Sequence, residues 1–176
     1  MSFNPKIHHK KSIRLNGFDY ASEGLYFITI CVKDKRCLFG FIENKQMNFT
    51  DIGRKANDFW LEIPEHFPHI ELLEFVVMPN HMHGIIEIKN PPLATVRIGH
   101  VQSLHPIPQP GPGSIPTIIQ QYKSAVKRWT NKNERNYFEW QSRFHDHIIR
   151  STEEYCRIAD YIEKNPAKWP DDKFYV

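Results

Sequence analysis

Short runs of β-branched and aromatic residues dominate the first part of the chain and are typical of strands. The run from Leu25 to Val32 predicts a central strand. Leu38 to Glu43 predicts a second strand, joined to the first by the charged turn of residues 33–36. A turn at Asn44 and Lys45 follows, and a short third strand is expected from Met47 to Phe49.

The next segment has the spacing of a helix with one buried face. Thr50 or Asp51 is suited to cap this helix, and Pro64 and Pro68 are expected to end it. Its apolar residues over positions 52–63 fall on one face: Ile52, Ala56, Phe59, Trp60 and Ile63. The pattern therefore predicts an amphipathic helix.

Two further strands are predicted close together, at Glu71 to Met78 and at Met82 to Ile88. The continuous apolar run of residues 75–77 is expected of a strand that is covered on both faces. From Asn90 to Gly113 the chain is rich in proline and glycine, and no periodic pattern survives. This segment, residues 90–113, predicts a long, irregular surface loop.

The C-terminal part predicts two helices separated by a strand. Ser114 is expected to cap the first helix, with Pro116 in its first turn. Its buried stripe is formed by Ile118, Ile119, Tyr122, Ala125, Val126 and Trp129. Phe144 to Arg150 predicts the strand. The last helix begins at Ser151 or Thr152, with Glu154 completing a capping pattern, and stops near Asn165 and Pro166.

This order of elements favours an α+β protein. A ferredoxin-like (RRM-like) antiparallel sheet with helices packed on one face accommodates it, and the length of 176 residues fits one domain spanning residues 1–176. No apolar stretch approaches the roughly 20 residues of a membrane helix. The basic N-terminus lacks the apolar segment of a secretory signal, so a cytoplasmic location is expected.

The amino-acid composition excludes few functions. The three cysteines, Cys31, Cys37 and Cys156, have no metal-site spacing and predict reduced thiols. The net charge of +3 is compatible with nucleic-acid binding. Ten histidines are many for this length, and their placement is therefore more informative than the charge.

His81 and His83 are the first candidate metal ligands. Alternate side chains of a strand share a face, so both imidazoles are able to approach one ion while Met82 points into the core. Two histidines do not complete a divalent site, which requires further ligands. The second pair, His145 and His147, ranks lower because its middle residue is charged; His147 is instead a candidate phosphate contact.

Tyr161 is the candidate nucleophile. A tyrosine is able to attack a phosphodiester when a metal polarises the phosphate. Asn165 follows four residues later on the same predicted helix face, and its amide oxygen is a suitable third ligand. The rival, Tyr122, matches the buried stripe of its helix and is interpreted as a core residue.

At this point the residues resemble a known family. Met78-Pro-Asn-His-Met-His-Gly-Ile-Ile86 is similar to the HUH motif of the single-tyrosine transposases, which comprise IS200-like insertion-sequence transposases and REP-associated tyrosine transposases. Further similar segments cover nearly the whole chain outside residues 90–113: 12–15, 19–20, 26–31, 114–126, 140–150 and 160–166.

The resemblance implies a specific activity. His81 and His83 would bind Mg²⁺ or Mn²⁺, with Asn165 in the position of a third ligand. Tyr161, on the C-terminal helix, would attack a DNA phosphate to give a 5′-phosphotyrosine and a free 3′-OH. The substrate would be single-stranded DNA carrying an imperfect hairpin. Family members work as homodimers or as monomers, so the resemblance leaves the oligomeric state open.

Basic residues are candidates for contacts with the DNA backbone: Lys123, Lys127, Arg128, Arg143 and Arg150, together with His147. Two alternatives remain. The first is a nucleic-acid-binding module that keeps the fold without catalysis, and it predicts salt-sensitive binding without cleavage. The second is a metal hydrolase that uses activated water, and it predicts free phosphate ends without a protein–DNA adduct.

Overall fold

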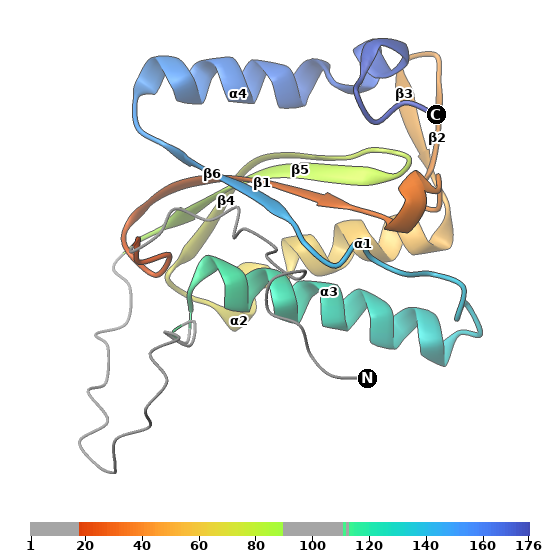
Figure 1. Cartoon of the computed structure of the whole chain (residues 1–176), viewed down its shortest axis with the longest axis horizontal. Coiled ribbons are helices and arrows are strands. Elements are labelled where there is room, and N and C mark those ends of the chain that lie inside the picture. Colours follow the sequence, from red (N-terminus) through yellow and green to blue (C-terminus); the bar gives the residue numbers. More distant parts are fainter. Residues whose placement is uncertain (1–17, 90–110, 112) are drawn as a thin grey trace, which may run out of the picture.

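The structure is a computed structural model that describes residues 18–89, 111 and 113–176. The predicted N-terminal basic segment and most of the 90–113 loop lie outside these residues. Figure 1 shows a sheet with helices above and below it. The sheet consists of β1 (Gly24–Cys31), β4 (Ile70–Val77), β5 (His81–Ile88) and β6 (His145–Ile149), in the order β4-β5-β1-β6 with every neighbouring pair antiparallel.

This strand order confirms the expected ferredoxin-like arrangement. Each half contributes a strand, a helix and a second strand, and β1 and β5 occupy the centre. A separate hairpin of β2 (Gly40–Glu43) and β3 (Gln46–Phe49) is inserted between β1 and the first helix. Asn44 and Lys45 both have positive φ at its tip, as the predicted tight turn requires.

Two helices cover one face of the sheet and form the main core. They are α1 (Asp51–Leu61) and α3 (Ile115–Lys132). Trp60 of α1 packs so closely on β5 that a Cβ added to Gly84 would lie 2.5 Å from the indole. On the strands, residues such as Tyr26, Ile28 and Met82 point into this core. The predicted inward direction of Met82 is therefore confirmed, and the predicted central strand at residues 25–32 corresponds to β1.

The predicted helix over residues 52–63 is interrupted at its end. It stops at Leu61, and a separate single turn, α2 (Ile63–His66), follows with Pro64 near its start. Proline has no N–H to continue a helix but fits its first turn, which explains the break. At the other end, Thr50 caps α1, because its hydroxyl accepts a hydrogen bond from Gly53 N.

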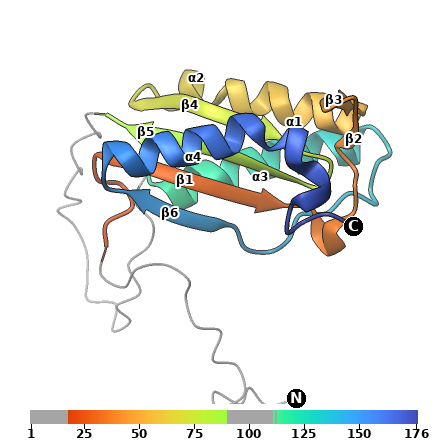
Figure 2. The same ribbon diagram turned by 90° about the horizontal axis from the view of Figure 1, so that it is seen from above.

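The last helix covers the opposite face of the sheet. Helix α4 (Thr152–Lys164) lies on the side of the sheet away from α1 and α3 (Figures 1 and 2), with its backbone nearest β4 and β5. Ile158 and Ile162 pack on Ile85 and Ile149 of the sheet. Ser151 caps the helix by accepting from Glu154 N, as predicted. Both faces of the sheet are thus covered, in agreement with the apolar run 75–77 of β4.

The chain turns back after α4. The 3₁₀ helix η2 (Pro166–Asp171) is followed by residues 172–176, which lie near the β2–β3 hairpin and the start of β5 (Figure 1). Another 3₁₀ turn, η1 (Lys33–Lys35), follows β1. No helix in the described part of the chain is long and apolar enough to cross a membrane.

Candidate metal site beside an exposed tyrosine

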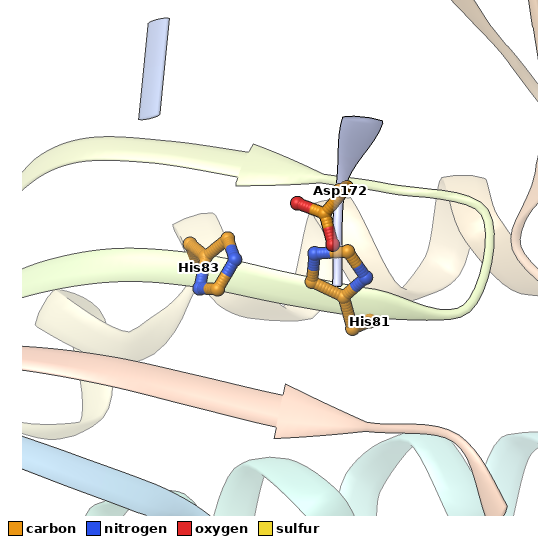
Figure 3. A group of neighbouring side chains, drawn as sticks. All are labelled: His81, His83 and Asp172. Carbon is orange, nitrogen blue, oxygen red and sulfur yellow. The ribbon is translucent and has the colours of Figure 1, made fainter. Parts of the chain in front are cut away.

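His81 and His83 lie at the start of β5 on the face covered by α4. They stand opposite Cys31 and Thr29 of β1, and their ring centroids are 4.6 Å apart. Met82 between them points into the core on the other face. Figure 3 shows both imidazoles on the same side of the strand, with the carboxylate of Asp172 beside them. The same-face placement agrees with the strand alternation in the sequence.

Asn80 determines which nitrogen of His81 is available. Its amide group donates to the carbonyl oxygens of Lys35 (3.0 Å) and Phe174 (2.9 Å), so both amide hydrogens are used. The remaining oxygen, Oδ1, accepts from His81 Nδ1–H at 2.9 Å. Nε2 of His81 therefore carries the lone pair, and this atom is buried without a hydrogen-bond partner.

His83 is held in a similar way. Its Nδ1 lies 2.8 Å from the Thr29 hydroxyl, and Nε2 lies 3.1 Å from the hydroxyl of Tyr161. The ring of Phe27 stacks on the imidazole with a centroid distance of 5.3 Å. When Nδ1–H donates to Thr29, Nε2 presents its lone pair on the side of Tyr161. Such outer partners are typical of metal-binding histidines.

Burial keeps both imidazoles neutral near pH 7. Removal from water lowers the pKa of His81 to about 4. The pKa of His83 is also lowered well below its usual value, first by burial and then by the neighbouring His81 and by Lys173. A neutral imidazole is the form that binds metals, so neither ring has to lose a proton to act as a ligand at neutral pH.

Tyr161 reaches the histidines from α4 and remains open to solvent. Its side chain is 38% exposed, and its hydroxyl lies 3.1 Å from His83 Nε2 and 3.3 Å from Asp172 Oδ2, so these two acceptors share its single proton. Partial burial, and then the charge of Asp172, raise the pKa of Tyr161 to about 12. The phenol is thus protonated at neutral pH, and it would have to lose this proton to act as a nucleophile.

Asn165 and Asp172 complete the cluster. Asn165 is 2% exposed, and its Nδ2 donates to Asp172 Oδ2 at 3.1 Å, while its own Oδ1 is buried without a partner. The i+4 spacing places it beside the side chain of Tyr161, as expected. Sequence reasoning missed Asp172, because nothing in the pattern beyond Pro166 indicates that the chain returns to β5.

The donor set fits a divalent ion. One donor atom each from His81, His83 and Asp172 lies within 4.8 Å of the other two. The buried, unpartnered Nε2 of His81 is the strongest single indication, because a buried polar atom without a partner is costly unless something binds it. Two neutral imidazoles and one carboxylate are suitable donors for a divalent metal such as Mn²⁺.

The other candidate residues lie apart from this cluster. Tyr122 is a core residue, as interpreted: its buried hydroxyl donates to Ala56 O, and burial raises its pKa. His145 and His147 are exposed on β6, and His147 Nε2 lies 2.7 Å from Glu154 Oε1. His81 and His83 therefore remain the preferred metal ligands, and Tyr161 remains the candidate nucleophile.

The predicted DNA-contacting residues do not converge on Tyr161. Lys123 and Lys127 lie on α3, across the sheet, and donate to the carbonyl oxygens of Gln141 and Phe138. Arg128, Arg143 and Arg150 are exposed at separate places, on α3 and on either side of β6. The role of these five residues in DNA binding stays a prediction. Lys123 and Lys127 also bind the segment that connects α3 to β6.

A groove beside Tyr161 carries basic residues that sequence reasoning missed. The cavity has a volume of about 510 Å³, and its lining includes Phe27, Arg157, Lys164 and Lys168. Arg157 and Lys164 lie on α4 with Tyr161, and Lys168 lies on η2. The i, i+4 and i+7 spacing of Arg157, Tyr161 and Lys164 on one helix is the signal that was available in the sequence.

Replacing Asn80 by Ala should weaken Mn²⁺ binding to the DNA-free protein by about 10- to 100-fold, because the orientation of His81 is then no longer fixed. Calorimetric titration measures the affinity. Asn131→Ala, an exposed change on α3, serves as the control and should leave the affinity unchanged. An Asn80→Ala protein that binds Mn²⁺ as tightly as the wild type would contradict this role of Asn80.

Comparison with known proteins agrees with the geometry. No protein-family model matches the sequence. An uncharacterised protein of Haemophilus influenzae is 42% identical over 175 residues, covering 99% of this chain and 97% of the relative. A second protein of the same organism, named as a REP-associated tyrosine transposase, is 25% identical over 170 residues, covering 89% of this chain and 83% of the relative.

The fold is also shared with a solved structure. A REP-associated tyrosine transposase bound to a REP hairpin superposes with a TM-score of 0.57 at 22% identity, covering 86% of this chain and 71% of that one. This likeness concerns the fold, while the sequence relationships extend over almost the full length of the chain. The chain is thus related in sequence, and similar in fold, to REP-associated tyrosine transposases.

Proposed function

We propose that the protein is a divalent-metal-dependent enzyme that cuts single-stranded DNA beside a hairpin and joins the 5′ phosphate to Tyr161. The relationship to REP-associated tyrosine transposases supports DNA processing in general. One observation supports the specific chemistry: the hydroxyl of Tyr161 lies 3.1 Å from Nε2 of His83, next to the unpartnered Nε2 of His81.

His81 and His83 would hold the ion, with Asn165 as the third ligand expected from the sequence. A bound ion polarises a phosphate and offsets the negative charge that develops during attack. Asn80 and Thr29 keep the two imidazoles oriented before substrate arrives. Phe27 packs against both His83 and Tyr161, with ring centroids 5.3 and 6.4 Å away, which keeps nucleophile and ligand together.

The proposed reaction exchanges one phosphodiester for another. The oxygen of Tyr161 forms a bond to phosphorus, and the bond from phosphorus to the 3′ oxygen of the preceding nucleotide breaks. The proton that the phenol loses balances the proton that the departing 3′ oxygen gains. Energy of the broken bond is retained in the phosphotyrosine, so a 3′-OH is able to reverse the reaction on another strand.

Single-stranded DNA has access to Tyr161 along the groove. Arg157, Lys164 and Lys168 line this groove together with Tyr161 and would contact the phosphates on either side of the cut. Asp160, Asp171 and Asp172 also line it, and Lys164 pairs with Asp160, so the DNA backbone would compete with this ion pair. The relative of known structure was solved with a hairpin, and we infer that a hairpin also marks the cleavage site for this chain.

The test is an incubation of the full chain with a labelled single strand that carries a hairpin, with Mn²⁺ or with a chelator. We expect a covalent protein–DNA adduct and a fragment ending in 3′-OH with Mn²⁺, and neither product with the chelator. Salt-sensitive binding without any cleavage would support the non-catalytic module instead. Free phosphate ends without an adduct would support a hydrolase that uses water.

A further inference from the structure

The segment after α4 brings a carboxylate to the histidines. Asp172 follows η2, and its Oδ1 accepts from the backbone N–H of Phe174 at 2.7 Å. The ring of Phe174 lies over His81 with a centroid distance of 4.3 Å, and its carbonyl oxygen accepts from Asn80. Phe174 therefore contacts both Asp172 and His81, and it fixes the carboxylate beside the histidine pair.

The distances allow one ion to use all three side chains. Ligands of an octahedral Mg²⁺ or Mn²⁺ site lie about 2.1 Å from the ion, so two of them are separated by about 3 Å when adjacent and by about 4.2 Å when opposite. The donors of His81, His83 and Asp172 already lie within 4.8 Å of one another. Side-chain shifts of up to about 1 Å are thus sufficient to bring the three donors onto one ion.

Charge favours the carboxylate as a ligand. His81 and His83 are neutral, and Lys173 lies close enough to lower the pKa of both. A dication that binds here loses part of its hydration shell and lies near the positive charge of Lys173. It therefore requires a negatively charged ligand. Asp172 supplies that charge, whereas the amide of Asn165 does not.

Asn165 and Asp172 do not exclude each other. The Nδ2 of Asn165 donates to Asp172 Oδ2 and holds the carboxylate, while its unpartnered Oδ1 remains available. Six positions around an octahedral ion leave room for both residues, the two histidines and a phosphate oxygen.

We propose that Asp172 is a further protein ligand of the divalent ion, in addition to His81 and His83. This inference rests on the proposed function, since it concerns the metal of the same site. It also gives the C-terminal segment a role: residues 166–176 carry a ligand rather than only covering the sheet.

Mn²⁺ binding to the DNA-free, full-length protein tests the proposal. Free Mn²⁺ is measured by electron paramagnetic resonance during titration of the wild type, Asp172→Asn and Asp171→Asn. The control at the exposed Asp171 removes the same charge one residue away from the cluster. We expect Asp172→Asn to weaken binding by at least about 10-fold, and Asp171→Asn to change it by less than about twofold.

Asn at position 172 keeps an oxygen for the Phe174 N–H, and thermal unfolding of both variants verifies their folding. A second measurement uses the wild type alone: Mn²⁺ should slow hydrogen exchange at the Phe174 amide, because the ion fixes its acceptor. Equal weakening by both variants, unchanged binding in Asp172→Asn, or unchanged exchange at Phe174 would each overturn the proposal.

His81→Ala separates this inference from the proposed function. If the wild type binds Mn²⁺, His81→Ala abolishes binding and Asp172→Asn does not weaken it, the histidine site stands and only the role of Asp172 is wrong. If the wild type does not bind Mn²⁺, or His81→Ala binds it equally well, the metal dependence in the proposed function fails.

Discussion

Tyr161→Phe abolishes the covalent protein–DNA adduct and lowers the rate of strand cleavage by at least about 10⁴-fold, the scale at which loss of a nucleophile reduces catalysis. The substitution removes a single oxygen, the one that lies 3.1 Å from His83 Nε2. The aromatic ring and its contact with Phe27 remain. The measurement is a single-turnover cleavage assay in Mn²⁺ with separation of the adduct by gel electrophoresis.

Tyr155→Phe is the matched control on the same helix. The hydroxyl of Tyr155 donates to Glu74 on β4, at the bulge between Leu72 and Phe75, and it has no contact with the histidines. Its removal should cost roughly 1 kcal/mol of stability and leave the adduct intact. Persistence of the adduct in Tyr161→Phe, or its loss in Tyr155→Phe alone, would assign the nucleophile to another residue.

His81→Ala should eliminate Mn²⁺ binding and lower cleavage by about 10³-fold, which corresponds to about 4 kcal/mol of transition-state stabilisation. The large effect is expected because Nε2 of His81 is buried and has no hydrogen-bond partner among the described residues, which leaves its lone pair free to bind an ion. Calorimetric titration and single-turnover cleavage measure the two losses separately.

The second His-x-His pair provides the control for metal binding. His147 is exposed and lies against Glu154, so His147→Ala should retain the Mn²⁺ affinity of the wild type. If instead His147→Ala loses the metal and His81→Ala keeps it, the assignment of the two pairs is reversed. Retention of metal-dependent cleavage in His81→Ala would remove the histidine site from the mechanism.

Local periodicity was sufficient to predict the parts of the site that lie on single elements. Alternation along β5 placed His81 and His83 on one face and Met82 on the other, because successive side chains of a strand point to opposite faces. Helical spacing placed Asn165 beside Tyr161. The antiparallel sheet and its helices followed from the same two periods, with small differences where Pro64 starts a new turn.

Interactions between distant segments were outside the reach of such patterns. The role of Asn80 depends on the carbonyl oxygens of Lys35 and Phe174, which only the tertiary structure brings together. Asp172 reaches His81 and His83 because η2 reverses the chain, and no periodic signal marks that reversal.

Lys123 and Lys127 show the opposite error of pattern reasoning. Their positions on the polar side of α3 favoured a surface role, and the sequence contained no indication that the chain returns along this helix. In the structure they donate to backbone carbonyls of residues 138 and 141, and burial lowers the pKa of Lys123. The charge of these two lysines suggested that both side chains are free at the surface, whereas the fold uses them to bind backbone carbonyls.

Mapping the residue that becomes linked to DNA tests the central claim most directly. The adduct formed with Mn²⁺ is digested with trypsin and nuclease, and the peptide that retains a nucleotide is identified by mass spectrometry. Cleavage after Arg157 and Lys164 leaves residues 158–164, in which Tyr161 is the single tyrosine. The account predicts a nucleotide phosphate on this peptide; a nucleotide on the exposed Tyr137 or Tyr175, with an unmodified 158–164 peptide, would contradict it.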